Sequence, residues 1–299
     1  MVELCKPYKL RLHDLQLLNN YRISSVDSLN IYTKKLPYTD LDYILKIQHF
    51  LSSLPQSVVK GEYVCLPDNV IRKLFKFAQL RKTDVFYHLG CGTNNTIRIA
   101  AKEFNVKKSV GVEVNKSLAN NARNKITDVN NARIANQDIR KASISEATVL
   151  LFWFTDSKVI HQMIKRFERE LTDGARVITI WSPLELMMPA KAQFPFFICK
   201  KPFKYAKNLS EQIKAIYGTD CIDFTASWLL SEKYIDALEV VPGEHRRFLN
   251  ILHSLIIWTN AWNSDVACEH EIPAPVITYI GILKTFFNLD LSTLIKATS

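Results

Sequence analysis

The sequence predicts an α/β fold in which a parallel β-sheet is covered by helices on both faces. Between about residues 61 and 185, short apolar runs alternate with segments whose apolar residues recur at helical spacing. The runs are almost continuously apolar, which is typical of strands buried on both faces. Gly90 and Gly92 follow the first run, and Glu113 ends the next. This arrangement predicts a ligand site at the carboxyl edge of the sheet.

The elements of this core follow one another in a regular order. A first helix begins after Pro67, where Asp68 provides a polar start. Helices are expected over residues 68–78, 96–104, 116–126 and 157–171. Strands are expected over residues 84–89, 109–114, 132–135, 147–154 and 175–181. The alternation predicts successive βαβ units.

The chain on either side of this core lacks the regular alternation of strands and helices. Residues 1–60 are expected to form an N-terminal helical arm, with one good helical stretch over residues 39–51. Residues 186–299 are expected to form a mostly helical C-terminal extension. That extension starts with a stretch rich in Pro, Phe and Lys (189–207) and continues with helices near residues 209–217, 228–238, 244–262 and 276–287. The predicted domains are therefore 1–60, 61–185 and 186–299.

Composition sets the general class of protein. The 299 residues are 47% apolar and 23% charged, as in ordinary globular proteins. A net charge of +10 favours an acidic partner such as nucleic acid. No stretch approaches the ~18 apolar residues of a membrane span, and the N-terminus lacks the apolar core of a signal peptide. We therefore expect a cytoplasmic protein that does not bind membranes.

Six widely spaced cysteines include no CxxC pair. This spacing argues against a zinc ribbon or a redox motif and favours reduced thiols. We expect no metal site.

The residues that point to chemistry surround Gly90-Cys91-Gly92. Glycine is scarce, with 8 in the chain, so two of them between a strand and a helix favour a close approach of the backbone to a ligand. Glu113 stands about twenty residues later, where an acidic side chain accepts hydrogen bonds from the ribose hydroxyls of an adenosine. Asp138, after the third strand, is a candidate acceptor for the adenine amino group.

These residues resemble the seven-stranded class I methyltransferases, which have a Rossmann-like sheet and depend on S-adenosylmethionine. Within that class they resemble the small archaeal protein-lysine methyltransferases. Residues 88–95 are similar to the glycine motif of the family, and the likeness continues through 99–114 and 143–149. It covers roughly residues 61–181.

The resemblance implies S-adenosylmethionine as the cofactor and assigns a set of binding residues. Tyr63 belongs to a segment (63–67) that closes over the cofactor in those enzymes. The implied cofactor-binding residues are Tyr63, His88, Gly90, Cys91, Gly92, Asn94, Glu113 and Asp138.

Two residues depart from the pattern of the family. His88 stands where the family usually has an acidic residue, and Asn94 stands where it usually has a third glycine. A protonated His88 would repel the cationic end of the cofactor, whereas a neutral one offers a single lone pair. The alternative interpretation of His88 is a core histidine at the strand end.

The segment after the fourth strand lines the transfer site in the family. Here it reads Phe-Trp-Phe-Thr-Asp (152–156), without the Asn-Pro-Pro-Tyr signature of adenine or glutamine N-methylation. Trp153 and Asp156 are the candidate catalytic residues, because an aromatic wall suits a lysine side chain and a carboxylate can steer or deprotonate an amine. The alternatives are a packed aromatic core and a helix N-cap.

The function expected from this resemblance is methyl transfer from S-adenosylmethionine to a protein lysine. A nucleic-acid methyltransferase is an alternative because of the positive charge, and a catalytically degenerate binding or scaffold protein is another. The C-terminal extension is expected to replace the antiparallel hairpin that normally ends the sheet of the family.

Several features of the extension have two interpretations. Residues 199–207 interleave basic and aromatic side chains, as in a phosphate-binding or base-stacking site or in a solvated loop. The segment 221–228 contains Cys221 and Ser227 without a base at a defined spacing, and residues 268–271 form either part of a metal site or a polar turn. The largely apolar helix at 246–258 requires burial, either within the chain or in a homodimer.

Overall fold

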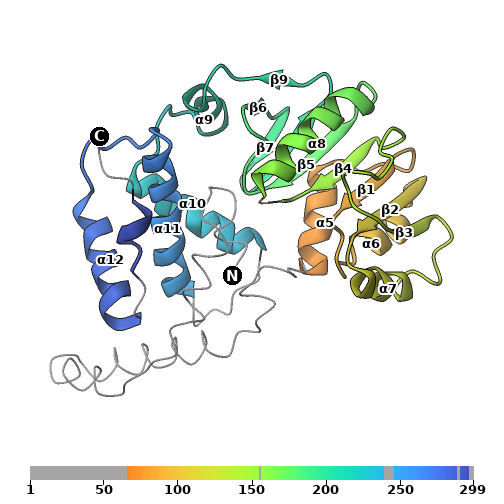
Figure 1. Cartoon of the computed structure of the whole chain (residues 1–299), viewed down its shortest axis with the longest axis horizontal. Coiled ribbons are helices and arrows are strands. Elements are labelled where there is room, and N and C mark those ends of the chain that lie inside the picture. Colours follow the sequence, from red (N-terminus) through yellow and green to blue (C-terminus); the bar gives the residue numbers. More distant parts are fainter. Residues whose placement is uncertain (1–65, 155, 239–245, 288–289, 296–299) are drawn as a thin grey trace. The chain divides into compact units, whose positions relative to one another are not determined.

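The computed structural model describes residues 66–154, 156–238, 246–287 and 290–295 (Figure 1). The chain divides into two compact units. Of the described residues, the sheet unit includes 66–220 and 236–238, and the helical unit includes Cys221–Ile235 and the residues from 246 onward. The predicted N-terminal arm, with its helix at 39–51, lies outside the described residues.

The sheet unit contains the alternation of strands and helices that the sequence predicts. Its elements are α5 (Asp68–Phe77), β1 (Val85–Leu89), α6 (Thr96–Lys102), β2 (Lys108–Glu113), α7 (Lys116–Asn124), β3 (Ala132–Asn136), β4 (Val149–Phe152), α8 (Ser157–Glu170), β5 (Arg176–Ile180), β6 (Met187–Met188), β7 (Lys191–Gln193), β8 (Phe196–Lys200), β9 (Lys204–Tyr205) and α9 (Leu209–Tyr217). The predicted core elements are confirmed, with ends that differ by a few residues.

Seven strands form one sheet in the order β3-β2-β1-β4-β5-β8-β7. Strands β1 to β5 are parallel, and β8 and β7 are antiparallel to their neighbours. The chain moves outward in one direction from β1 and in the other from β4, so these adjacent strands flank the point where the strand order reverses. Ligands bind at such a point, beyond the carboxyl ends of the strands.

The hairpin at the edge of the sheet corrects one expectation. The C-terminal extension does not replace it, because residues 191–200 form β7 and β8, and β8 pairs with β5 from Arg176↔Lys200 to Ile180↔Phe196. The apolar run Phe196–Cys199 is buried in this pairing, which is why it belongs to the sheet. As a division into domains, the boundaries at residues 60 and 185 stay predictions.

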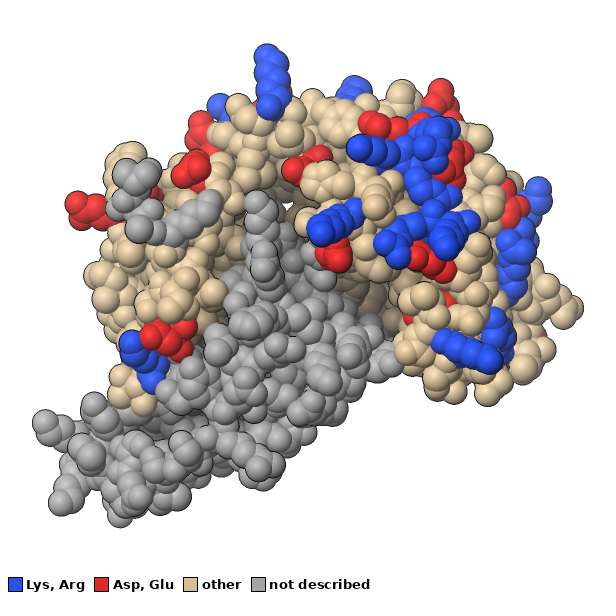
Figure 2. Space-filling view, in the orientation of Figure 1, with Lys and Arg blue, Asp and Glu red and all other residues tan. Residues whose placement is uncertain are grey.

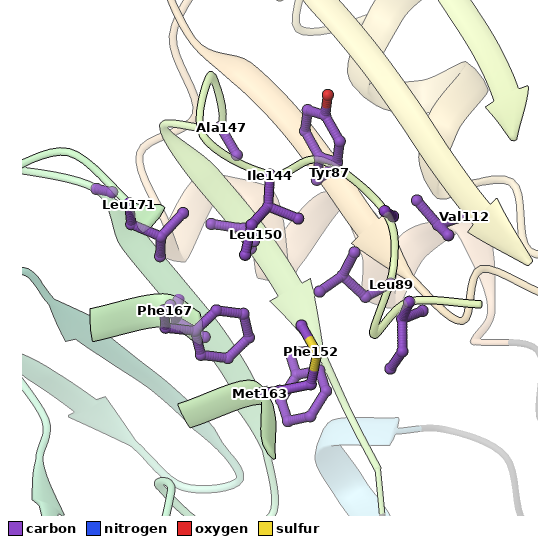
Figure 3. Close-up of a cluster of buried hydrophobic side chains, with 14 of the residues drawn as sticks. Tyr87, Leu89, Val112, Ile144, Ala147, Leu150, Phe152, Met163, Phe167 and Leu171 are labelled. Atoms are coloured by element: carbon purple, nitrogen blue, oxygen red, sulfur yellow. The ribbon is translucent and has the colours of Figure 1, made fainter. Parts of the chain in front are cut away.

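The main core lies between the sheet and α8. Alternate residues of β1, including Tyr87 and Leu89, point to this face and pack with Met163 and Phe167 of α8 (Figure 3). The opposite face of β1 meets α5, where the rings of Phe75 and Phe86 lie 5.0 Å apart between centroids. Helices thus cover both faces, as predicted.

The helical unit contains α10 (Phe224–Leu238) as far as Ile235, α11 (Arg246–Asn263), α12 (Ala274–Phe287) and the short 3-10 helix η3 (Ser292–Leu294). The helices predicted at 228–238, 244–262 and 276–287 are confirmed. Helix α11 is buried almost continuously from Phe248 to Ala261 within a single chain. The burial that its apolar sequence requires therefore needs no second subunit.

Cys221 and Cys268 form a disulfide in this unit, so the expectation of reduced thiols is wrong for this pair. A parallel bridge between Ile222 and Ala267 brings the two cysteines together across 47 residues. The disulfide occupies Cys221, which is therefore not a free nucleophile. Glu269 accepts hydrogen bonds from Phe224 N (2.9 Å) and Trp258 Nε1 (3.0 Å), so it supports packing in a polar turn.

Among the helices of the described residues, none is both long and apolar enough to cross a bilayer.

Gly111 in β2 provides the space in which the loop after β1 packs. A Cβ at this position would lie 2.7 Å from Cys91 Sγ and 2.7 Å from Ile134 Cδ1. We expect Gly111→Ala to lower the free energy of unfolding by about 2 kcal/mol, because overpacking forces neighbours apart. Urea denaturation measures this change, and Gly281→Ala is the control because a Cβ there would meet nothing within 4 Å in the part of the chain that the structure describes. Equal stabilities of the two variants would contradict the close-packing argument.

Candidate functional site

The predicted site residues lie at the edge of the sheet where the parallel strands end. The loop after β1 holds Gly90 and Gly92, β2 ends at Glu113, and Asp138 follows β3. The segment 153–156 follows β4, which is the neighbour of β1 at the point of strand reversal. Most of the predicted site residues thus converge on one edge, although they are spread over sixty-odd residues of sequence.

The glycine loop turns sharply after β1. Gly90 and Gly92 have φ values of +73° and +52°, which glycine adopts without strain. The loop is fixed to β2, because Gly90 N and Cys91 N both donate to Val112 O, at 2.8 and 3.1 Å. Among the described residues, chain neighbours aside, a Cβ on Gly92 would have only Asn94 Nδ2, at 3.8 Å, within 4 Å. The backbone of Gly92 is therefore open to a ligand.

Glu113 connects the end of β2 to this loop. Its buried carboxylate accepts Gly92 N at 3.0 Å through Oε2 and Asn115 N at 2.8 Å through Oε1. A carboxylate has about four lone-pair sites, so each oxygen keeps a second one. Two adjacent hydroxyl groups, as on a ribose, fit this acceptor pair. The arrangement is consistent with a nucleoside-containing cofactor.

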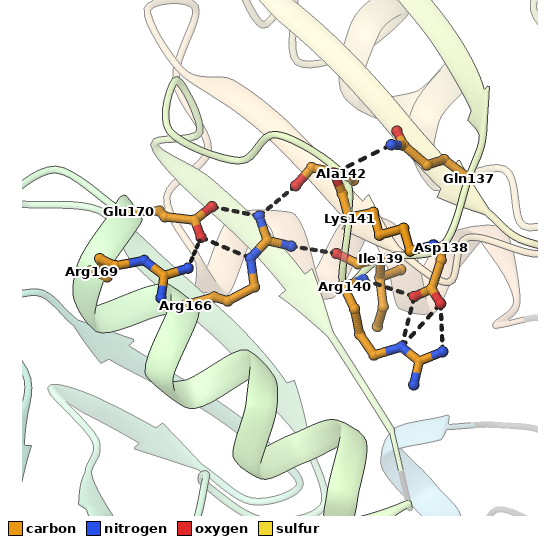
Figure 4. A network of polar contacts seen from close by, with 9 residues as sticks. All are labelled: Gln137, Asp138, Ile139, Arg140, Lys141, Ala142, Arg166, Arg169 and Glu170. Carbon is orange, nitrogen blue, oxygen red and sulfur yellow. Dashed lines mark hydrogen bonds and ion pairs between the residues drawn. The ribbon is translucent and has the colours of Figure 1, made fainter.

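Asp138 is held within its own loop. Its Oδ1 accepts Arg140 N at 2.8 Å, and the Arg140 guanidinium bonds both carboxylate oxygens (Figure 4). The hydrogen bonds from Arg140 lower the pKa of Asp138 to about 2. Asp138 is therefore an ionised acceptor at neutral pH. Its contact with adenine stays a prediction.

His88 is a buried side chain at the end of β1. Nδ1 lies 2.7 Å from Thr96 Oγ1 at the start of α6, and burial lowers the pKa of His88 to about 3. The imidazole is therefore neutral at physiological pH and does not repel a cation. This geometry supports the alternative interpretation, a histidine of the core.

Cys91 contributes its backbone to the loop. Its side chain is buried beside Gly111, and burial raises the pKa of the thiol to about 12. The thiol is therefore protonated and packs as a small apolar group. Any contact of Cys91 with a cofactor is expected through its main chain.

Asn94 fastens the glycine loop to the start of α5. Oδ1 accepts Leu66 N at 2.8 Å, and Nδ2 donates to Cys91 O at 3.2 Å. Its φ is not positive, so the site of the third glycine needs no left-handed residue here. The asparagine side chain is used for a contact that glycine cannot make.

Restoring the glycine of the family is therefore expected to weaken this protein. Asn94→Gly loses both side-chain hydrogen bonds and adds backbone freedom, so we expect the free energy of unfolding to fall by about 2 kcal/mol. Urea denaturation measures the change, with Asn130→Gly as the exposed control. A variant as stable as the parent protein would show that the Leu66 contact contributes nothing.

The aromatic segment after β4 lies over the glycine loop. A Cβ on Gly90 would meet the Phe154 ring at 2.6 Å, and this ring stacks on Phe152 with centroids 5.0 Å apart. Trp153 is half-buried. Asp156 Oδ1 accepts Lys158 N (2.8 Å) and Val159 N (3.1 Å) as the N-cap of α8. The alternative interpretation of Asp156 as an N-cap is thus observed, and the catalytic roles of Trp153 and Asp156 stay predictions.

Tyr63 lies outside the described residues. Sequence reasoning missed Asn136, whose Nδ2 donates to Glu113 O and Val114 O, both at 2.9 Å. This side chain ties the end of β3 to the end of β2. An asparagine as the last residue of a strand was the available signal.

The positive charge of the chain is mixed with negative charge on the visible surface. Figure 2 shows Lys and Arg side chains gathered over the sheet unit, with Asp and Glu between them. In the basic and aromatic segment 199–207, Cys199 is buried, Lys201 Nζ donates to Glu168 O (2.6 Å), and Tyr205 Oη donates to Glu168 Oε1 (2.6 Å). These contacts hold the segment against α8, and nucleic-acid binding stays a prediction.

Comparisons with known proteins identify methyltransferases that are similar to this chain. The family model described as "Histone methylation protein DOT1" matches residues 53–136. A protein-lysine N-methyltransferase of Saccharolobus islandicus is 36% identical over 137 residues, which cover 42% of this chain and 83% of that protein.

Solved methyltransferase structures are also similar. An RNA methyltransferase from Salinibacter ruber, crystallised with S-adenosyl-L-homocysteine, is 22% identical, covers 49% of this chain and 99% of its own, and gives a TM-score of 0.45. An S-adenosylmethionine-dependent methyltransferase from Clostridium acetobutylicum is 21% identical over 37% of this chain and 47% of its own, with a TM-score of 0.31. On the strength of the S. islandicus relative, the chain belongs to the S-adenosylmethionine-dependent methyltransferase family that includes that protein-lysine N-methyltransferase.

Proposed function

We propose that this protein transfers the methyl group of S-adenosylmethionine to the amine of a lysine side chain in another protein. The observation that carries the proposal is the 36% identity to a protein-lysine N-methyltransferase over 83% of that relative. The site supports it, because Glu113 and the open backbone of Gly92 offer the groups that a nucleoside requires.

Different residues would bind different parts of the cofactor and the substrate. Glu113 would hold the ribose hydroxyls, the glycine loop would accommodate the amino-acid end, and Asp138 would accept the adenine amino group. The bound cofactor supplies an electrophilic methyl group on a sulfonium. Trp153 and Phe154, after β4, would line the entry of the lysine and limit access of water, which keeps the amine aligned.

Binding and transfer are tested separately. Calorimetry with S-adenosylhomocysteine is expected to give heat and a saturable curve. No heat and no thermal stabilisation at millimolar ligand would contradict the cofactor site and favour a scaffold function.

For transfer, the protein is incubated with methyl-labelled S-adenosylmethionine and an extract of the source cells, with and without nuclease. Label in nuclease-resistant protein, at lysines identified by mass spectrometry, is the expected result. Loss of the label on nuclease treatment would overturn the lysine proposal and identify a nucleic-acid acceptor.

A further inference from the structure

Arg166 of α8 donates hydrogen bonds to two carbonyl groups of the loop after β3 and to a carboxylate of its own helix. Its side chain is 12% exposed. Nη1 donates to Ile139 O at 2.7 Å and Nη2 donates to Ala142 O at 2.6 Å (Figure 4). Nε donates to Glu170 Oε1 at 2.8 Å, one turn further along the helix. A planar fork can satisfy two carbonyls and a carboxylate together, whereas a lysine ammonium cannot match this geometry.

The loop that Arg166 holds is the one that presents Asp138. Lys141 N and Ala142 N donate to Asp138 O, at 2.9 and 3.1 Å, so the loop closes into a single turn around this residue. The loop is also fixed at its beginning, because Gln137 N donates to Glu113 O at 3.0 Å. The two carboxylates expected to contact the nucleoside are thus fixed relative to each other.

The ion pair between Arg166 and Glu170 is formed at neutral pH. Hydrogen bonds from Arg166 are the main reason why the pKa of Glu170 is lowered to about 2. Arg169 also donates to Glu170 Oε1, at 2.6 Å, but its side chain is 70% exposed. Among the described residues, the side chain of Arg169 bonds Glu170 and makes no hydrogen bond to the turn of residues 138–142. This makes Arg169 a matched control on the same helix.

We propose that Arg166 is a positioning residue for recognition of the adenine, acting through the turn of residues 138–142 that it holds against α8. The proposal rests on the proposed function, since it takes Asp138 as the acceptor for the adenine amino group. Arg166 would act through this turn and not by contacting the cofactor. Its role is to fix where the Asp138 carboxylate lies beyond the end of β3.

The test compares two nucleosides in calorimetry. S-adenosylhomocysteine carries the amino group, and S-inosylhomocysteine has a carbonyl oxygen in its place. The parent protein is expected to prefer the adenosine form by ~10-fold or more, as for one hydrogen bond to a charged group. Arg166→Lys is expected to bring this preference below threefold, while the affinity for the inosine form stays nearly constant. Arg169→Lys is expected to keep the preference of the parent.

The other possible results contradict either the role of Arg166 or the proposed function, as follows. If Arg166→Lys weakens both ligands equally, or if Arg169→Lys has the same effect, Arg166 is only a structural residue. A parent protein that binds both nucleosides equally refutes the inference and leaves the cofactor site standing. A parent that binds neither refutes the proposed function as well. Should Arg166→Lys not fold, Glu170→Gln is measured instead, with a partial loss of preference expected and an unchanged preference contradicting the role.

Discussion

Glu113→Gln is expected to weaken the binding of S-adenosylhomocysteine about 100-fold. In the parent protein both carboxylate oxygens accept a backbone N–H, from Gly92 at 3.0 Å and from Asn115 at 2.8 Å. Glutamine has one oxygen, so its NH₂ group must face one of these N–H groups and cannot accept a ribose hydroxyl. The loss of hydrogen bonds to a charged group accounts for about 3 kcal/mol.

Isothermal titration of the folded variant measures this effect, with Glu103→Gln as the control. Glu103, directly after α6, is 41% exposed and pairs with Arg72 of α5, so its substitution should leave the dissociation constant unchanged. A melting curve separates the loss of affinity from the loss of structure. A change of less than threefold for Glu113→Gln would show that Glu113 supports the loop without contacting the ligand.

The fold of the core was predictable because its signals are local. Most strands from β1 to β5 are short runs rich in apolar residues, with β3 the more polar exception, and each helix between them carries its own spacing of apolar residues. The hairpin was missed because Phe196–Cys199 is embedded in a segment rich in proline and lysine. Pairing with β5, and not local pattern, defines β8 as a strand.

The contacts that shape the site join residues far apart in sequence. Asn94 reaches back 28 residues to Leu66, and Arg166 reaches back 24 and 27 residues to Ala142 and Ile139. In the helical unit, the disulfide likewise joins Cys221 to a partner 47 residues away. Residue type and spacing predicted where Glu113 and Asp138 would lie. They could not predict the side chains that hold the loops, since any of several polar residues could serve.

His88→Asn is expected to remove a large part of the acid sensitivity of the protein. Burial lowers the pKa of His88 to about 3, whereas the unfolded chain has a value near 6.5. Below pH ~6.5 the unfolded state therefore binds a proton that the native state rejects. The neutral imidazole contributes its full stability above this pH and loses it as the pH falls toward 3. Between pH 8 and pH 5 the loss amounts to about 2 kcal/mol.

Asparagine does not titrate, and its amide can bond Thr96 Oγ1 from about the position of Nδ1. Urea denaturation at a series of pH values is therefore expected to give a flatter stability curve for His88→Asn, with the two curves converging as the pH falls. His270→Asn is the control, because that histidine is exposed and its substitution should give the same stability curve as the parent protein. Parallel curves for the parent and His88→Asn would show that His88 has the same pKa in the native state as in the unfolded chain, and so binds its proton equally well in both.

The His88→Asn variant also tests whether His88 contacts the cofactor. A neutral side chain at this position neither attracts nor repels a cation, so its replacement should change the affinity little. At pH 7.5 we expect S-adenosylhomocysteine to bind His88→Asn within threefold of the parent. If affinity instead falls tenfold or more while stability is kept, His88 contacts the ligand and is more than a buried partner of Thr96. The departure of His88 from the acidic residue of the family then becomes a difference in how the amino-acid end is held.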